Sequence, residues 1–188
     1  LSRWRHTSID ENIQNNTSDK HNSKALLKMP ALLPVLGGFV LYSAVEATCG
    51  LWGATFIHNR FEVSAADAAM ASTLYFSAIT LGRLGSGFAA KYLSDADMIR
   101  AGQLLALIGV ILLLLPSKAL AIAGLMIMGL GLAPIIPSMI HSTPQKFGLE
   151  LSQTAIGLEM AFAYVGSTCF PPLFGILANR WGVDFYTW

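Results

Sequence analysis

Two glutamates, Glu46 and Glu159, lie near the middle of long apolar runs. A charged side chain in the hydrocarbon region of a membrane costs about 2.5 to 3.5 kcal/mol on insertion scales, so such residues usually mark a functional site. In a helix, Tyr42, Gly50 and Gly53 share one face with Glu46, and small and polar residues on one face are typical of a bundle interior. Each carboxyl group could accept hydrogen bonds from a polar substrate or take up a proton. Alternatively, each could be a protonated or paired group that only holds helices together.

The second glutamate stands on a similar helical face. Four small or hydroxyl-bearing side chains lie on the same helical face as Glu159. The repeated pattern predicts that both glutamates face the inside of a bundle or a water-filled cavity. The residues that share the face of Glu159 are Ser152, Ala155, Ala163 and Gly166.

One arginine, Arg83, stands in the glycine-rich segment Gly82-Arg83-Leu84-Gly85-Ser86-Gly87. It precedes Lys91 by eight residues, or about 12 Å along a helix, so its side chain can reach toward the aqueous surface. One interpretation is a conformational latch, in which the guanidinium pairs with Glu150, Asp95 or helix-end carbonyl groups in one state and releases them in another. The other interpretation is a simple interfacial anchor.

Proline pairs interrupt two of the apolar runs. In Gly129-Leu130-Gly131-Leu132-Ala133-Pro134-Ile135-Ile136-Pro137, Pro134 and Pro137 each remove a backbone donor, which predicts a kinked or locally opened helix. Such a bend lets a bundle open at one end while it stays closed at the other, although a static kink is the alternative. We expect the same of Pro171 and Pro172.

The composition defines the class of protein that must position these residues. Of 188 residues, 54% are hydrophobic and 12% are charged, about half the charged share of an ordinary soluble domain. This excludes a soluble nucleic-acid binder, a disordered tail and a disulfide-stapled module, and it predicts an all-α membrane protein, a polytopic bundle of transmembrane helices. The histidines and cysteines lack metal-ligand spacing and no clustered catalytic set is visible, so we expect no enzyme, cofactor or metal site.

Hydropathy divides the chain into two parts. Residues 1–28 are polar and predict a solvated linker, whereas residues 29–188 predict a transmembrane helical domain with about five spans. The short loops leave the helix bundle as the place for recognition. The chain opens on a polar stretch without an initiator Met, and its aromatic end at Trp188 is expected to open a sixth helix, so we interpret it as a piece of a longer protein. The expected spans are 30–57, 66–90, 101–115, 119–140 and 152–178.

The distribution of Lys and Arg predicts the orientation in the membrane. Eight such residues collect on one side and three on the other, and the more basic side is normally cytoplasmic. The linker 1–28 is therefore expected in the cytoplasm, and the chain in the plasma membrane or a bacterial inner membrane. The basic side holds Arg3, Arg5, Lys20, Lys24, Lys28, Lys91, Arg100 and Lys146, and the other side Arg60, Lys118 and Arg180.

Taken together, these motifs resemble the C-terminal half of a major facilitator superfamily transporter, most nearly its fucose-permease-like sugar branch. The resemblance covers nearly the whole chain and implies helices 7 to 11 of twelve. Residues 1–28 would then be the central loop, and a six-helix N-terminal half would be the partner of this bundle. The matching segments are Gly82-Arg83 through Lys91 after helix 8, Ala133-Pro134-Ile135-Ile136-Pro137 with Ser142-Thr143-Pro144 in helix 10 and its loop, and Pro171-Pro172-Leu173-Phe174-Gly175 in helix 11.

This resemblance implies a secondary active transporter that moves a small polar solute, a sugar by likeness to that branch, by alternating access. It also implies coupling to a proton or sodium gradient. Glu46, Tyr42 and Glu159 are the candidate substrate contacts, and Arg83, Pro134 and Pro137 the candidate gating residues. The alternative is a helical membrane scaffold or assembly subunit that does not transport.

Overall fold

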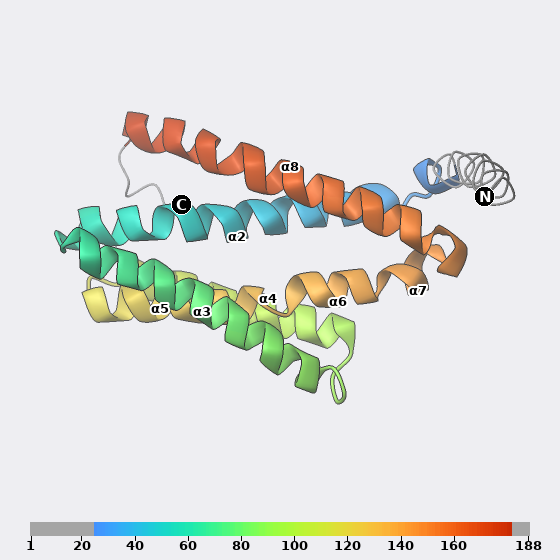
Figure 1. Cartoon of the computed structure of the whole chain (residues 1–188), viewed down its shortest axis with the longest axis horizontal. Helices are drawn as coiled ribbons and strands as arrows, with labels where there is room; N and C mark the ends of the chain where they lie inside the picture. The colour runs from blue at the N-terminus through green and yellow to red at the C-terminus, as the bar shows by residue number, and fades with distance from the viewer. Residues whose placement is uncertain (1–24, 182–188) are drawn as a thin grey trace, which may run out of the picture.

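The chain is a bundle of long helices in the computed structural model, which describes residues 25–181 (Figure 1). Residues 1–24 of the expected linker lie outside the described residues. The fold is all-helical, which confirms the expected class. The helices are α2 (Leu32–Phe61), α3 (Ala65–Ala89), α4 (Asp95–Leu114), α5 (Lys118–Leu132), α6 (Ile135–His141), α7 (Thr143–Phe147) and α8 (Leu149–Trp181).

The helices pack in a row rather than around one axis. α8 lies along α2, α2 contacts α3 and α5, and α5 in turn packs against α3 and α4 (Figure 1). The two short helices after α5 pack against different neighbours: α6 contacts α4, and α7 contacts α8. The segment 135–147 therefore joins the two ends of the row.

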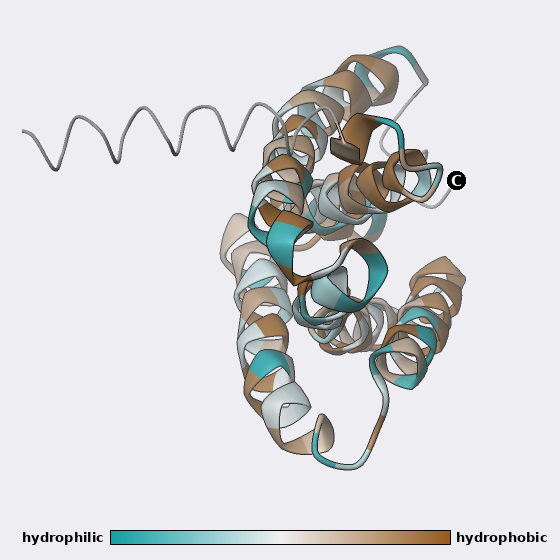
Figure 2. Cartoon of the chain, turned by 90° about the vertical axis from the view of Figure 1, so that its right-hand side faces the viewer, coloured by the Kyte–Doolittle hydropathy of each residue, from teal (hydrophilic) through white to brown (hydrophobic). Residues whose placement is uncertain are grey.

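Four stretches of helix in the described part of the chain are long and apolar enough to cross a membrane: Leu32–Phe61, Asp95–Leu114, Lys118–Phe147 and Leu149–Arg180. α3 is also expected to span but does not reach this hydropathy, because Asp67, Arg83 and several Ser, Thr and Gly residues lower its mean. Large apolar side chains such as Leu33 and Leu51 point outward from the bundle, and Figure 2 shows apolar residues on the outer faces of the helices. A bilayer can cover these surfaces.

Serine caps fix the starts of two helices. Ser64 and Ser94 each accept a hydrogen bond from the backbone N–H three residues later, at the start of α3 and α4. α4 therefore begins at Asp95, before the expected span of 101–115, because Asp95 and Asp97 favour the first turn of a helix even though they are polar.

One proline pair accompanies a break in a helix and the other does not. Helix α5 ends at Leu132 and α6 begins at Ile135, so the chain is interrupted around Pro134 as expected. In contrast, α8 continues through Pro171 and Pro172, where the sequence predicts a break. Trp52 of α2 donates its indole N–H to the carbonyl of Pro171 at 3.0 Å, so α2 contacts α8 at this proline pair.

The backbones of α2 and α8 approach each other closely at Gly166. A Cβ atom at this position would collide with the backbone carbonyl of Val40. Small residues allow such approach between membrane helices, where van der Waals packing drives association. Gly166 therefore fixes the depth at which α8 lies against α2.

Candidate functional site

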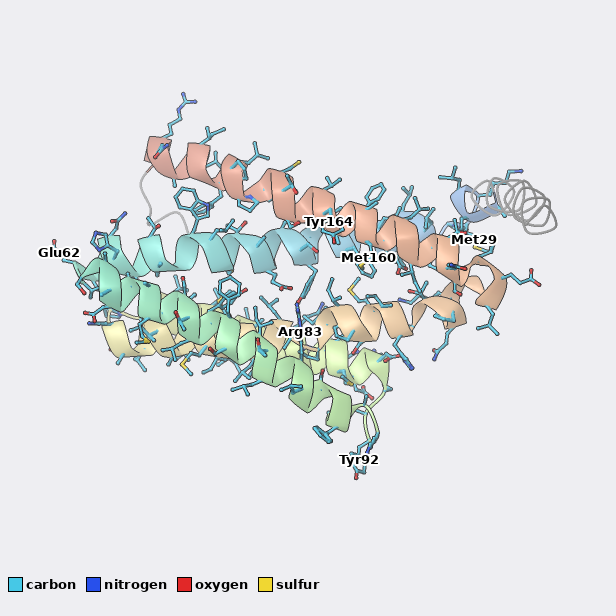
Figure 3. The ribbon with its side chains drawn as sticks, in the orientation of Figure 1. Met29, Glu62, Arg83, Tyr92, Met160 and Tyr164 are labelled. Carbon is cyan, nitrogen blue, oxygen red and sulfur yellow. The ribbon has the colours of Figure 1, made fainter. Side chains whose placement is uncertain are left out.

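The centre of the bundle holds an ion pair between α2 and α3. Arg83 Nη2 lies 2.8 Å from Glu46 Oε1, and Figure 3 shows Arg83 extending from α3 toward α2. The side chains are 46% and 23% exposed, so the pair is partly open. A guanidinium and a carboxylate side by side can exchange their mutual contact for hydrogen bonds to a polar ligand.

This partner of Arg83 differs from the expected ones, Glu150, Asp95 or helix-end carbonyls. Counting residues to Lys91 predicts a side chain that reaches for the aqueous surface. Because α3 runs back along α2 after a short connection, Arg83 lies instead at the depth of Glu46. If α2 and α3 are antiparallel neighbours, counting equal numbers of residues back and forward from the connection at 62–64 places Glu46 opposite the stretch between Tyr75 and Arg83. This contact could therefore have been found from the sequence.

Hydroxyl groups support the backbone around this pair. The Tyr75 hydroxyl donates to the carbonyl of Glu46 at 3.0 Å, and the Ser86 hydroxyl donates to the carbonyl of Arg83 at 2.8 Å. The Tyr75 side chain is fully buried. From the sequence Tyr75 is only an aromatic residue that could pack or stack, so sequence reasoning missed its contact with the residue that carries the charge.

Tyr42, one turn before Glu46 on α2, forms a hydrogen bond with the backbone of another helix. Its hydroxyl donates to the carbonyl of Leu132 at 2.8 Å, and its side chain is 7% exposed. Leu132 is the last residue of α5, directly before the interruption at Pro134. Tyr42 thus ties the helix that carries Glu46 to the break between α5 and α6.

Glu159 occupies a different place, between α8 and α7. Its side chain is fully buried, and Thr143 Oγ1 lies 2.9 Å from each carboxyl oxygen. Within residues 25–181 no ion pair involves Glu159, and no hydrogen bond joins it to Glu46, Tyr42 or Arg83. The structure therefore separates the candidate substrate contacts into two sites.

A cavity of about 710 Å³ lies between the second half of α3, the start of α4 and the segment α6–α7, with Arg83 in its wall. His141 Nδ1 lies 2.8 Å from Asp95 Oδ2 across it. Ser138 Oγ is buried and has no hydrogen-bond partner among the described residues. Such a lining suits water or a polar solute. From the sequence, Asp95 is an expected partner of Arg83. The polar residues of the lining besides Arg83 are Ser86, Ser94, Asp95, Ser138, His141, Ser142, Gln145 and Lys146.

A metal site is not formed by the described residues, since no three His, Cys, Asp or Glu side chains lie close enough together to hold an ion.

A family model described as Major Facilitator Superfamily matches residues 34–188. The chain belongs to the major facilitator superfamily. This membership confirms the superfamily resemblance and a multi-pass membrane protein, and the superfamily is one of transporters rather than enzymes.

Two curated relatives are bacterial members of this class. An uncharacterized MFS-type transporter of Yersinia pestis is 26% identical over 142 residues, which cover 75% of this chain and 36% of the relative. An uncharacterized transporter of Sinorhizobium fredii is 26% identical over 135 residues, which cover 71% of this chain and 36% of the relative. The chain thus spans about a third of the length of these relatives. No solved structure matches it. The sugar branch, the coupling ion and the orientation stay predictions.

Proposed function

We propose that the chain is the C-terminal part of a secondary active transporter that moves a small polar solute by alternating access. The observation that carries this proposal is the ion pair between Glu46 and Arg83, which joins α2 to α3 in a partly exposed setting with Arg83 in the wall of a cavity of about 710 Å³. Charged groups inside a membrane protein usually belong to a substrate or ion pathway. Alternating access then requires the six-helix half that the superfamily resemblance implies, with the solute bound between the halves.

In this mechanism the solute competes with the ion pair. Glu46 can accept hydrogen bonds from hydroxyl groups of the solute, and Arg83 can donate to its oxygens. A polyhydroxylated solute such as a sugar offers both, which agrees with the resemblance to the sugar branch. When the solute takes these bonds, the direct contact between α2 and α3 is weakened, so binding favours a different arrangement of the two helices.

The break at Pro134 supplies a place for the bundle to bend. Segment α6–α7 follows this break and forms one wall of the cavity, so movement of this segment would change access to Arg83. In a hinge, a few residues absorb the change in backbone angles. A helix that is already interrupted at proline provides such residues, so no continuous helix has to break. Pro134 and Pro137 are thus proposed to act as bending points, with Tyr42 and Glu159 at the two ends of the moving segment.

We further propose that α3 spans the membrane with the four apolar stretches, and that the linker 1–28 lies in the cytoplasm. The length of α3, at 25 residues, is sufficient for about 30 Å of hydrocarbon. It packs against α2 and α5 through a face of mainly small and apolar residues such as Ala71, Tyr75 and Ala78, and Arg83 reaches Glu46 of α2.

Uptake into proteoliposomes tests this function. The full-length protein is reconstituted and offered a panel of radiolabelled hexoses, with an imposed proton gradient, a sodium gradient or neither. We expect accumulation of one sugar under one gradient, and a loss of at least about tenfold in Glu46→Gln, equivalent to about 1.4 kcal/mol of binding free energy. Glu62→Gln, at the exposed end of α2, is the matched control and should transport normally. Absence of uptake for every hexose rejects the sugar class, and absence with a broad solute panel favours a scaffold that does not transport.

A further inference from the structure

The hydroxyl of Thr143 lies among more acceptors than its single hydrogen can serve. Oγ1 is 2.9 Å from both carboxyl oxygens of Glu159 and 3.2 Å from the carbonyl oxygen of Met139. A threonine hydroxyl has one hydrogen and two lone pairs, and an ionised carboxylate only accepts. If Glu159 were ionised, its fully buried carboxylate would accept a hydrogen bond from one neutral donor, the Thr143 hydroxyl.

A proton on Glu159 resolves this arrangement. The protonated carboxyl group donates to Thr143 Oγ1, and the Thr143 hydroxyl then donates to the carbonyl of Met139. That carbonyl also accepts from the Ser142 hydroxyl at 2.8 Å, so its two lone pairs are both used. Every hydrogen in this chain of bonds has an acceptor, as buried polar groups require.

The surroundings of Glu159 offer little to balance a negative charge. On α7, Lys146 is the charged group that interacts electrostatically with Glu159, and no ion pair forms between them. On α2, the stretch from Leu32 to Val40 contains no titratable residue, and on α8 the nearest acidic group is Glu150, more than two turns earlier.

The packing around this turn of α8 is apolar. Ala155, one turn before Glu159, belongs to a buried cluster with Leu32 and Leu36 of α2 and Phe147 of α7. An unpaired carboxylate in such surroundings is costly, and neutralisation is the usual outcome.

We propose that Glu159 is a proton-binding site: it carries a proton while α7 lies against α8 and releases it to water when the two helices separate. On release, the O–H bond of the carboxyl group breaks, the electron pair stays on the carboxylate, and water takes up the proton and solvates the anion. The docked arrangement is therefore favoured at low pH and weakens as the pH rises. The role of this proton in coupling rests on the proposed function, although its presence on Glu159 does not.

The position of Thr143 links the proton to movement of the segment after the break. Residues 135–147 join the interruption at Pro134 to the contact with Glu159, and their other face lines the cavity that includes Arg83. Protonation of Glu159 thus biases the same segment that the transport mechanism needs to move. The segment 135–147 would thus couple Glu159 to the cavity beside Arg83, because it can lie either docked against α8 or apart from it.

Infrared spectroscopy of the full-length protein in proteoliposomes at neutral pH tests the proton directly. We expect a C=O stretching band of a protonated carboxyl group that disappears in Glu159→Gln and persists in the control Glu150→Gln. An unchanged band in Glu159→Gln, or loss of an ionised carboxylate band instead, would overturn the proposal. If Glu159→Gln does not fold, Thr143→Val and Thr143→Ser replace it: the band should shift in the valine variant, which lacks the hydroxyl, and stay in place in the serine variant.

Hydrogen exchange tests the link to movement. After correction for the intrinsic pH dependence, exchange of residues 135–147 should increase from pH 5.5 to pH 8.5 in the wild type and stay constant in Glu159→Gln. Equal responses of the two proteins would reject the link. Neither measurement requires transport, so uptake without the infrared band rejects this proposal alone, and the band without uptake rejects the proposed function alone.

Discussion

Glu46 and Glu159 carry the same side chain inside the same bundle, yet their surroundings differ in almost every respect. Glu46 faces a guanidinium at 2.8 Å in a partly open setting, whereas Glu159 faces the Thr143 hydroxyl and is fully buried. Glu46 connects two long helices, and Glu159 connects a long helix to a single short turn. The first site can hold its charge and offer it to a ligand; the second is built for a neutral group.

This difference shows that an acidic residue in an apolar run has no fixed role. The neighbour that the tertiary fold supplies decides whether the carboxyl group stays charged. A cation offsets the cost of taking the charge out of water, and a hydroxyl alone does not. Variants that remove each neighbour therefore test whether the two glutamates differ in this way.

The largest effect is expected at the charged site. Arg83→Met leaves Glu46 without its cation, and truncation of one partner of a fully buried, hydrogen-bonded charge pair typically costs about 2 to 5 kcal/mol. We expect the low end, since the pair is partly exposed, together with a loss of uptake of at least about tenfold. Thermal unfolding in detergent and uptake in proteoliposomes measure the two effects. The double variant Glu46→Gln with Arg83→Met should be more stable than Arg83→Met alone; additive losses would mean that the two side chains do not interact.

The next effect is expected at the neutral site. Thr143→Val removes the side-chain hydrogen-bond partner of Glu159 and should lower the free energy of unfolding by about 1 to 3 kcal/mol, the usual cost of a buried polar group left without a partner. Thr143→Ser keeps the hydroxyl and should lose less. Denaturant unfolding in mixed micelles measures both. Equal stability of the valine variant and the wild type would show that Thr143 does not satisfy Glu159.

A smaller effect is expected where the Glu46 helix meets the break. Tyr42→Phe removes the donor to the carbonyl of Leu132 and should cost about 0.5 to 1.5 kcal/mol. Hydrogen exchange should increase around residues 132–136, because the carbonyl loses the bond that holds it against α2. Tyr92→Phe, at a side chain that is 87% exposed, is the control. If exchange increases over the whole bundle instead, Tyr42 is a general packing residue.

The smallest effect is expected for an ion pair at the end of the bundle. Lys118 Nζ lies 3.3 Å from Asp67 Oδ2, but the side chains are 45% and 57% exposed. Exposed pairs contribute about 0.2 to 1 kcal/mol, so Asp67→Asn should change the unfolding temperature only slightly, and less at high salt. An effect as large as that of Arg83→Met would mean that position within the bundle does not distinguish the two pairs.

Part of the fold and of the candidate site follows from the sequence alone. Hydropathy locates the apolar runs, the cost of intramembrane charge singles out Glu46 and Glu159, and the glycine-rich segment draws attention to Arg83. The roles of these residues stay predictions. The break at Pro134 follows from the missing backbone donor. Helix starts are less accessible, because the first turn of α4 is stabilised by a cap and acidic residues rather than by apolar ones.

The contacts that these residues make are harder to predict from the sequence than the residues themselves. The contact of Arg83 with Glu46 depends on how α3 lies along α2, and the contact of Trp52 with the Pro171 carbonyl depends on how α8 lies along α2. Thr143 meets Glu159 only because the chain turns between α7 and α8. Each is a contact between different helices, which local propensity does not encode.

The packing of α2 against α8 also has a consequence for biosynthesis. The two helices lie together along much of their length, although α3 to α7 separate them in the chain. Since a ribosome makes the chain from its N-terminus, α2 enters the membrane before its neighbour exists. Its surface at Val40, Ala44 and Trp52, which packs against α8, must contact lipid or a chaperone during that interval. A variant that slows synthesis of α8 would therefore expose α2 to degradation even if the finished protein is stable.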